Sequence, residues 1–114
     1  MEKVNILGTE YTIEYKSFND DEKLKTRDGY TSFFTKSIVI ENNFEGRTDF
    51  IKEYQKKILR HEIIHAFIYE SGLDCNSLKV EEWAENEEMV DWFAIQSPKI
   101  FAIFYELKLL GDLV

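Results

Sequence analysis

The chain is 114 residues long and carries 22 acidic against 14 basic residues, which gives a formal net charge of −8. Nucleic-acid binding is disfavoured, because phosphate backbones are held by lysine and arginine. No apolar run is long enough to cross a bilayer, and the N-terminus lacks the basic and apolar regions of a signal peptide. A single cysteine excludes an intrachain disulfide. We therefore expect one cytoplasmic domain, spanning residues 1–114, with no membrane partner.

The first 47 residues have the pattern of strands and turns. Val4–Leu7 and Tyr11–Tyr15 flank Gly8, and such alternating segments around a turn residue predict a β-hairpin. Residues 30–34 and 37–41 are rich in β-branched and aromatic side chains. Each of these two segments predicts a further strand.

Residues 48–71 predict an α-helix. Thr48 or Asp49 can cap its first turn, and Gly72 stands where a left-handed residue commonly ends a helix. On a helical wheel, one stripe predicts the buried face, and it consists of Tyr54, Ile58, His61, Ile64, His65 and Ile68. The two histidines are therefore expected to face inward.

The C-terminal third of the chain predicts two further helices. The first covers residues 80–96 and stops at Ser97, because Pro98 disfavours a helical conformation in the residue before it. The second covers residues 99–110. The expected fold class is α+β, with a small, mainly antiparallel sheet packed on the helix of residues 48–71 and two further helices closing the core.

The strongest chemical signal is the motif His61-Glu62-Ile63-Ile64-His65. Residues four apart lie one turn apart on a helix, so His61 and His65 can direct a ring nitrogen at one metal ion. Glu62 can take a proton from water at that ion, as a general base does. Zn²⁺ is the expected cofactor, since two imidazoles, a carboxylate and water form a common catalytic zinc site. The competing interpretation is a pair of ordinary core histidines without metal.

A third metal ligand is expected downstream of this motif. Glu87 and Asp91 share a helical stripe with apolar residues, where a carboxylate is costly unless it is paired or binds a metal. Glu87 is the predicted ligand. Asp91 is predicted to accept the second ring N–H of a liganding histidine, which would orient the ring. Glu88 is the alternative ligand.

These motifs resemble those of gluzincin-type zinc metallopeptidases. The resemblance lies in His61–His65 and in Asn86-Glu87-x-x-x-Asp91, and it implies the same roles for Glu87 and Asp91. Residues 87–94 also resemble the Glu-x-x-Ala-Asp/Asn-x-Phe-Ala stretch of ImmA/IrrE-type peptidases, with Val90 where that family has alanine. This second resemblance implies a phage- or prophage-type accessory or regulatory protein that acts on a repressor.

The expected function is zinc-dependent hydrolysis of peptide bonds in a protein or peptide substrate. Peptidases of this type bind substrate along an edge strand beside the active-site helix. Ile38–Ile40 is the candidate for that edge, against the alternative of an ordinary sheet strand. Tyr30 and Tyr69 are candidates for stabilising the oxyanion. The alternative function is a non-catalytic, zinc-containing module that binds a repressor or host protein, and the sequence leaves the oligomeric state open.

Overall fold

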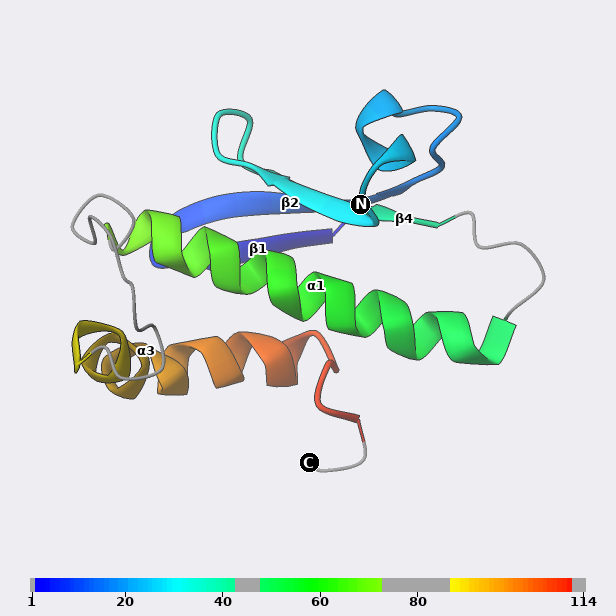
Figure 1. Cartoon of the computed structure of the whole chain (residues 1–114). Coiled ribbons are helices and arrows are strands. Elements are labelled where there is room, and N and C mark those ends of the chain that lie inside the picture. The colour runs from blue at the N-terminus through cyan, green and yellow to red at the C-terminus, as the bar shows by residue number, and fades with distance from the viewer. Residues whose placement is uncertain (1, 43–47, 73–86, 112–114) are drawn as a thin grey trace.

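The computed structural model describes residues 2–42, 48–72 and 87–111. Within these ranges it has a four-stranded sheet, one short 3-10 helix, η1 (Glu22–Lys25), and two α-helices, α1 (Thr48–Glu70) and α3 (Glu87–Glu106). Figure 1 shows α1 lying between the sheet and α3. The expected α+β fold is confirmed. No helix in the described ranges is long and apolar enough to cross a membrane.

All four predicted strands are present in one sheet. They are β1 (Glu2–Ile6), β2 (Thr9–Lys16), β3 (Gly29–Ser32) and β4 (Ser37–Glu41). Their order across the sheet is β1-β2-β4-β3. The pairs β1–β2 and β3–β4 are antiparallel, and β2–β4 is parallel. The sheet is therefore mixed, with the predicted antiparallel majority.

The first hairpin closes through a two-residue turn. Leu7 and Gly8 both have positive φ, 53° and 96°, and Ile6 pairs with Thr9. Two left-handed residues between paired strands form a type I′ turn, whose twist matches that of the strands it joins. Glycine adopts a positive φ more readily than leucine does. The Asn5 side chain supports the turn by accepting a hydrogen bond from the Gly8 amide at 2.8 Å.

The buried face of α1 differs from the predicted one. His61 and His65 are exposed, so the expectation that both face inward is wrong. The buried side of this part of the helix consists of Ile58, Leu59, Glu62, Ile63, Ala66 and Phe67, of which only Ile58 belongs to the predicted stripe. The helix carries two apolar stripes, and the core covers the one that lacks the histidines. The histidine stripe is left on a surface that the described elements cover only in part.

Helix α3 continues through Pro98, so the predicted break at Ser97 and the separate helix of residues 99–110 are wrong. Proline removes one backbone hydrogen bond to the carbonyl four residues earlier, here that of Ala94. Both Ala94 and Pro98 are exposed, which lets water solvate that carbonyl. Ile100 beyond the proline is buried in the core, and this packing holds the helix together. Residues 80–86 of the first predicted helix lie outside the described ranges.

The C-terminal end of α1 is fixed to the sheet by the Glu70 carboxylate. It accepts hydrogen bonds from the Tyr11 hydroxyl at 2.6 Å, Lys36 Nζ at 2.8 Å and the Thr9 hydroxyl at 3.0 Å. Burial alone would raise the pKa of Glu70, but the hydrogen bonds, led by that of Lys36, outweigh it and hold the pKa below its usual value. Burial and the adjacent carboxylate raise the pKa of Tyr11.

This network predicts a pH-dependent contribution to stability. Glu70→Gln should lower the free energy of unfolding by about 1–3 kcal/mol at neutral pH, because charge-assisted hydrogen bonds are lost. A carboxylate with a lowered folded-state pKa stabilises fully above its unfolded-state pKa, and loses that contribution as pH falls through the folded-state pKa. The difference in the free energy of unfolding between wild type and variant should therefore shrink when the pH falls below 4.5, the ordinary pKa of a glutamate. Urea denaturation at a series of pH values measures it.

The matched control is Glu53→Gln, which changes a carboxylate on the same helix whose side chain is 71% exposed. Its effect at neutral pH should stay within about 0.5 kcal/mol, as for most surface substitutions. Equal losses for the two variants would contradict the assigned role of Glu70.

Candidate active site

His61 and His65 lie one turn apart on α1 and direct the same ring nitrogen at one point. Their Nε2 atoms are 3.1 Å apart. The ring centroids are 4.7 Å apart, and the ring planes meet at 70°. The predicted pairing of the two imidazoles is therefore present, although the rings are exposed rather than buried.

This spacing fits a zinc ion held by both rings. Zinc–nitrogen bonds of 2.0–2.1 Å in tetrahedral geometry place two ligand nitrogens about 3.3 Å apart, close to the observed separation. The same distance also fits a hydrogen bond between the rings, in which one Nε2 donates and the other accepts. Geometry thus allows two of the predicted ligands to share one ion without a change of rotamer.

Glu62 differs from its two neighbours in being buried, with 8% of its surface exposed. Its Oε1 lies 2.9 Å from the hydroxyl of Thr31 on β3, and its main-chain oxygen lies 3.1 Å from that hydroxyl. One hydroxyl has one proton to donate, so the two oxygens compete for it. Thr31 is thereby a direct link between β3 and the predicted general base.

A cavity of about 490 Å³ opens at these three residues. One wall is the motif on α1. The other wall is the chain that leads into β3 and leaves it, with side chains or backbone of Thr26, Arg27, Gly29, Tyr30, Thr31 and Phe33. The cavity therefore combines the imidazoles, the carboxylate and a strand in one place.

Gly29 lets β3 approach the helix closely. A Cβ atom there would lie 2.7 Å from Ile58 Cγ2 and 3.0 Å from the Val39 carbonyl oxygen. Any larger residue would push β3 away from α1, because Cβ atoms do not tolerate contacts that short. The glycine is thus required for the width of the cavity.

Two tyrosines are the candidates for stabilising the oxyanion. Tyr69 does not line this cavity, and the hydroxyl of Tyr30 is hydrogen-bonded elsewhere. The Tyr30 hydroxyl donates to Asp21, and burial together with that carboxylate raises the pKa of Tyr30 to about 12. The Tyr69 ring stacks on Phe33 at a centroid distance of 4.2 Å and an interplanar angle of 4°. Neither assignment is tested further by this geometry, and both stay predictions.

The predicted third ligand falls outside what the structure describes. Glu87 begins α3, but its side chain and that of Glu88 lie outside the described residues. Asp91 is exposed on α3. Among the side chains that are described, no group of three or more His, Cys, Asp and Glu could hold a metal ion. The roles of Glu87 and Asp91 therefore stay predictions.

The edge of the sheet beside the site is β3, not the strand of Ile38–Ile40. That segment belongs to β4, which pairs with β2 on one side and β3 on the other. It is fully inside the sheet, so the predicted substrate-binding edge was wrong. The apolar composition of residues 37–41 is typical of an interior strand.

Sequence reasoning missed Thr31, Arg27 and Phe33 as cavity residues. Each is of a common type, and none stands in a motif. Only the placement of β3 along α1 identifies them. That placement depends on Gly29, and the sequence does not show that this glycine is packed closely against α1. As a sequence, Asp28-Gly29 indicates only a turn.

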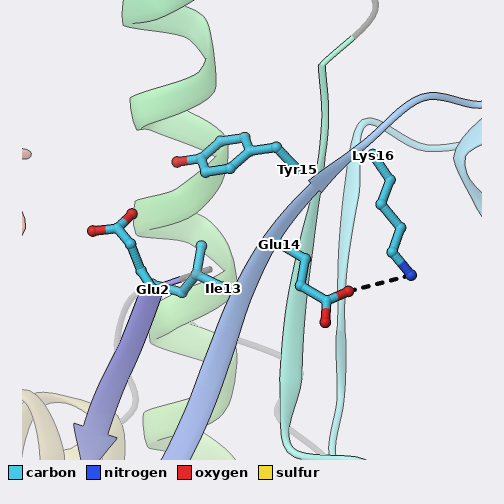
Figure 2. A pocket seen from close by; sticks show the side chains of 5 residues that line it. All are labelled: Glu2, Ile13, Glu14, Tyr15 and Lys16. Carbon is cyan, nitrogen blue, oxygen red and sulfur yellow. Dashed lines mark ion pairs between the residues drawn. The ribbon is translucent and has the colours of Figure 1, made fainter.

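A second cavity, of about 450 Å³, lies at the start of β1 and the end of β2 (Figure 2). Its charged side chains include Glu2 and Glu14, and the latter forms an ion pair with Lys16 at 3.2 Å. Burial and the charge of Glu2 raise the pKa of Tyr15. No histidine or cysteine is among the described residues that line it, so the cavity at α1 is the stronger candidate for chemistry.

Comparison with known proteins gives no further guide to the site, since no protein-family profile, curated protein or solved structure matches this chain.

The contact between Thr31 and Glu62 predicts a stability difference between two substitutions. Thr31→Val removes the donor and leaves a buried carboxylate without it, and should cost about 1–3 kcal/mol. Thr31→Ser keeps a hydroxyl and should cost less than about 1 kcal/mol. Urea denaturation at neutral pH measures both, and equal losses for valine and serine would show that the hydrogen bond does not stabilise Glu62.

Proposed function

We propose that this protein is a zinc-dependent peptidase that hydrolyses peptide bonds in a protein substrate. The observation that carries the proposal is the convergence of His61 and His65 Nε2 at 3.1 Å beside the buried carboxylate of Glu62, all at one cavity. Two imidazoles and an adjacent carboxylate on one helix are the side chains that metal-assisted hydrolysis needs.

Each side chain has a separate role in this proposal. His61, His65 and Glu87 hold the ion, and Asp91 orients a liganding histidine. Zinc bound there supplies a Lewis acid that makes water acidic and polarises a carbonyl. Glu62 accepts the proton from the attacking water and passes it to the leaving amine. Thr31 holds Oε1 of Glu62, which leaves Oε2 for that proton transfer.

The outer edge of β3 is the proposed binding site for the substrate backbone. Among the described strands, β3 is paired only with β4, so one of its sides carries free N–H and C=O groups. An extended peptide can add to such an edge through main-chain hydrogen bonds. Because Thr31 lies on β3 and contacts Glu62, a peptide bound there would pass next to the proposed base.

The resemblance to ImmA/IrrE-type peptidases supports a more specific proposal. The protein would be a cytoplasmic, phage- or prophage-type accessory protein, and its substrate would be a repressor. The support is confined to the sequence motifs at His61–His65 and Asn86–Asp91.

The alternative proposal is a non-catalytic, zinc-containing module that binds a repressor or host protein. One observation favours it: the Glu62 carboxylate is buried and already hydrogen-bonded to Thr31, as a structural carboxylate would be. Under this alternative the cavity binds a partner, and Glu62 serves the packing of β3 on α1.

Glu62→Gln separates these two functions. If Glu62 is the base, the variant should bind one zinc per chain but lose about 10²–10⁴-fold in peptide hydrolysis, the usual contribution of general acid–base catalysis. Zinc content is measured by elemental analysis and hydrolysis by mass spectrometry of peptide digests. His61→Ala and His65→Ala should each lose the zinc.

The matched control is Glu53→Gln, the same replacement at an exposed position of α1. It should keep both zinc and activity. Wild-type protein that takes up no zinc would overturn the metal site, whereas zinc uptake with no hydrolysis by the wild type would favour the binding module.

A further inference from the structure

Strand β3 runs beside α1 in the same direction as the helix. Three contacts establish this. Gly29 lies against Ile58, Thr31 is hydrogen-bonded to Glu62, and Phe33 stacks on Tyr69. From residue 29 to 33 a strand advances about 13 Å, and from residue 58 to 69 a helix advances about 16 Å. The two lengths agree, so positions along the cavity can be read from the residue numbers of β3.

The cavity therefore has two ends with different chemistry. Arg27 lines it before β3 begins, near the Gly29–Ile58 contact, and Phe33 lines it after β3 ends. Glu62 lies between these two residues, opposite Thr31. A peptide lying along β3 would thus meet a guanidinium on one side of the reacting bond and an aromatic ring on the other.

Arg27 is suited to hold a carboxylate. It is exposed and makes no ion pair with the described side chains. Among the described residues that line the cavity it is the only lysine or arginine, in a chain with a net charge of −8. A guanidinium presents paired N–H donors that match the two oxygens of a carboxylate.

The ring at the opposite end is held in place before any ligand binds. Phe33 stacks on Tyr69 at 4.2 Å, and Lys36 Nζ lies 4.8 Å from the Tyr69 ring centroid. Lys36 is in turn fixed by its 2.8 Å ion pair with Glu70. A fixed aromatic surface binds a flat apolar side chain at little cost in conformational entropy.

We propose that the cavity selects peptides with an aromatic residue on the N-terminal side of the reacting bond and an acidic residue on its C-terminal side. The order follows from antiparallel pairing with β3, the commoner arrangement of neighbouring strands, which places the C-terminal part of the peptide near Arg27. The proposal rests on the proposed function for the identity of the ligand as a peptide.

Binding to the Glu62→Gln protein tests this without hydrolysis. Four fluorescent peptides of equal length are compared by anisotropy: one with Phe before and Glu after the central bond, one with Glu replaced by Gln, one with Phe replaced by Ala, and one with the two residues exchanged. The first should bind about tenfold more tightly than each singly substituted peptide, the factor of one lost ion pair or ring contact, and about a hundredfold more tightly than the exchanged peptide, which loses both. Equal binding of the exchanged peptide overturns the proposal.

Substitutions in the cavity assign each preference to its residue. Arg27→Gln should abolish the preference for Glu over Gln, and Arg27→Glu should reverse it so that a Lys peptide binds best. Lys25→Gln is the control, since Lys25 is exposed and does not line the cavity. Phe33→Ala should abolish the preference for Phe over Ala, whereas Phe34→Ala, at a neighbouring side chain that is 97% exposed, should keep it.

The two proposals fail in different ways. If binding is selective and depends on Arg27 and Phe33, but the zinc-loaded wild type hydrolyses no peptide, the proposed selectivity stands and the peptidase proposal is overturned. If the wild type hydrolyses all four peptides equally well, the peptidase proposal stands and the proposed selectivity is overturned. Circular dichroism and thermal unfolding of each variant exclude misfolding, and a preference that survives Arg27→Gln in a folded protein overturns the role of Arg27.

Discussion

The close approach of β3 to α1 is the constraint on which the rest of the site depends. It is permitted by Gly29, where a side chain would collide with Ile58 and with the backbone of β4. The approach brings the Thr31 hydroxyl to the buried Glu62 carboxylate and places Phe33 on Tyr69. Glu62, the outer edge of β3 and the Phe33–Tyr69 pair are thus positioned by one interface rather than by three independent features.

The same hairpin compensates two acidic side chains of α1 whose burial would otherwise be unfavourable. Thr31 on β3 donates to Glu62, and Lys36 in the turn before β4 donates to Glu70. A buried carboxylate is tolerated when donors satisfy its oxygens. These two hydrogen bonds explain how α1 can carry Glu62 and Glu70 on the side that faces the sheet and still pack against it.

The sequence predicted the elements better than their faces. The strands follow from alternation of apolar and polar residues, and the end of α1 follows from Gly72, whose φ of 80° confirms the left-handed helix end. The histidine spacing was sufficient to predict that His61 and His65 converge. The buried face of α1 was not predictable from the wheel, because its two apolar stripes are alike and only the covering sheet distinguishes them. Pro98 failed as a helix breaker because tertiary packing of α3 outweighs one lost hydrogen bond.

The parallel pairing of β2 with β4 has a consequence for how the cavity could diverge. A parallel pair needs a long connection, and here residues 17–36 supply it, including η1 and β3. One whole wall of the cavity therefore belongs to a crossover and not to the paired centre of the sheet. Replacing that crossover would change the wall while β1, β2, β4 and α1 stayed in register, so the lining of the cavity and the stability of the core can evolve separately.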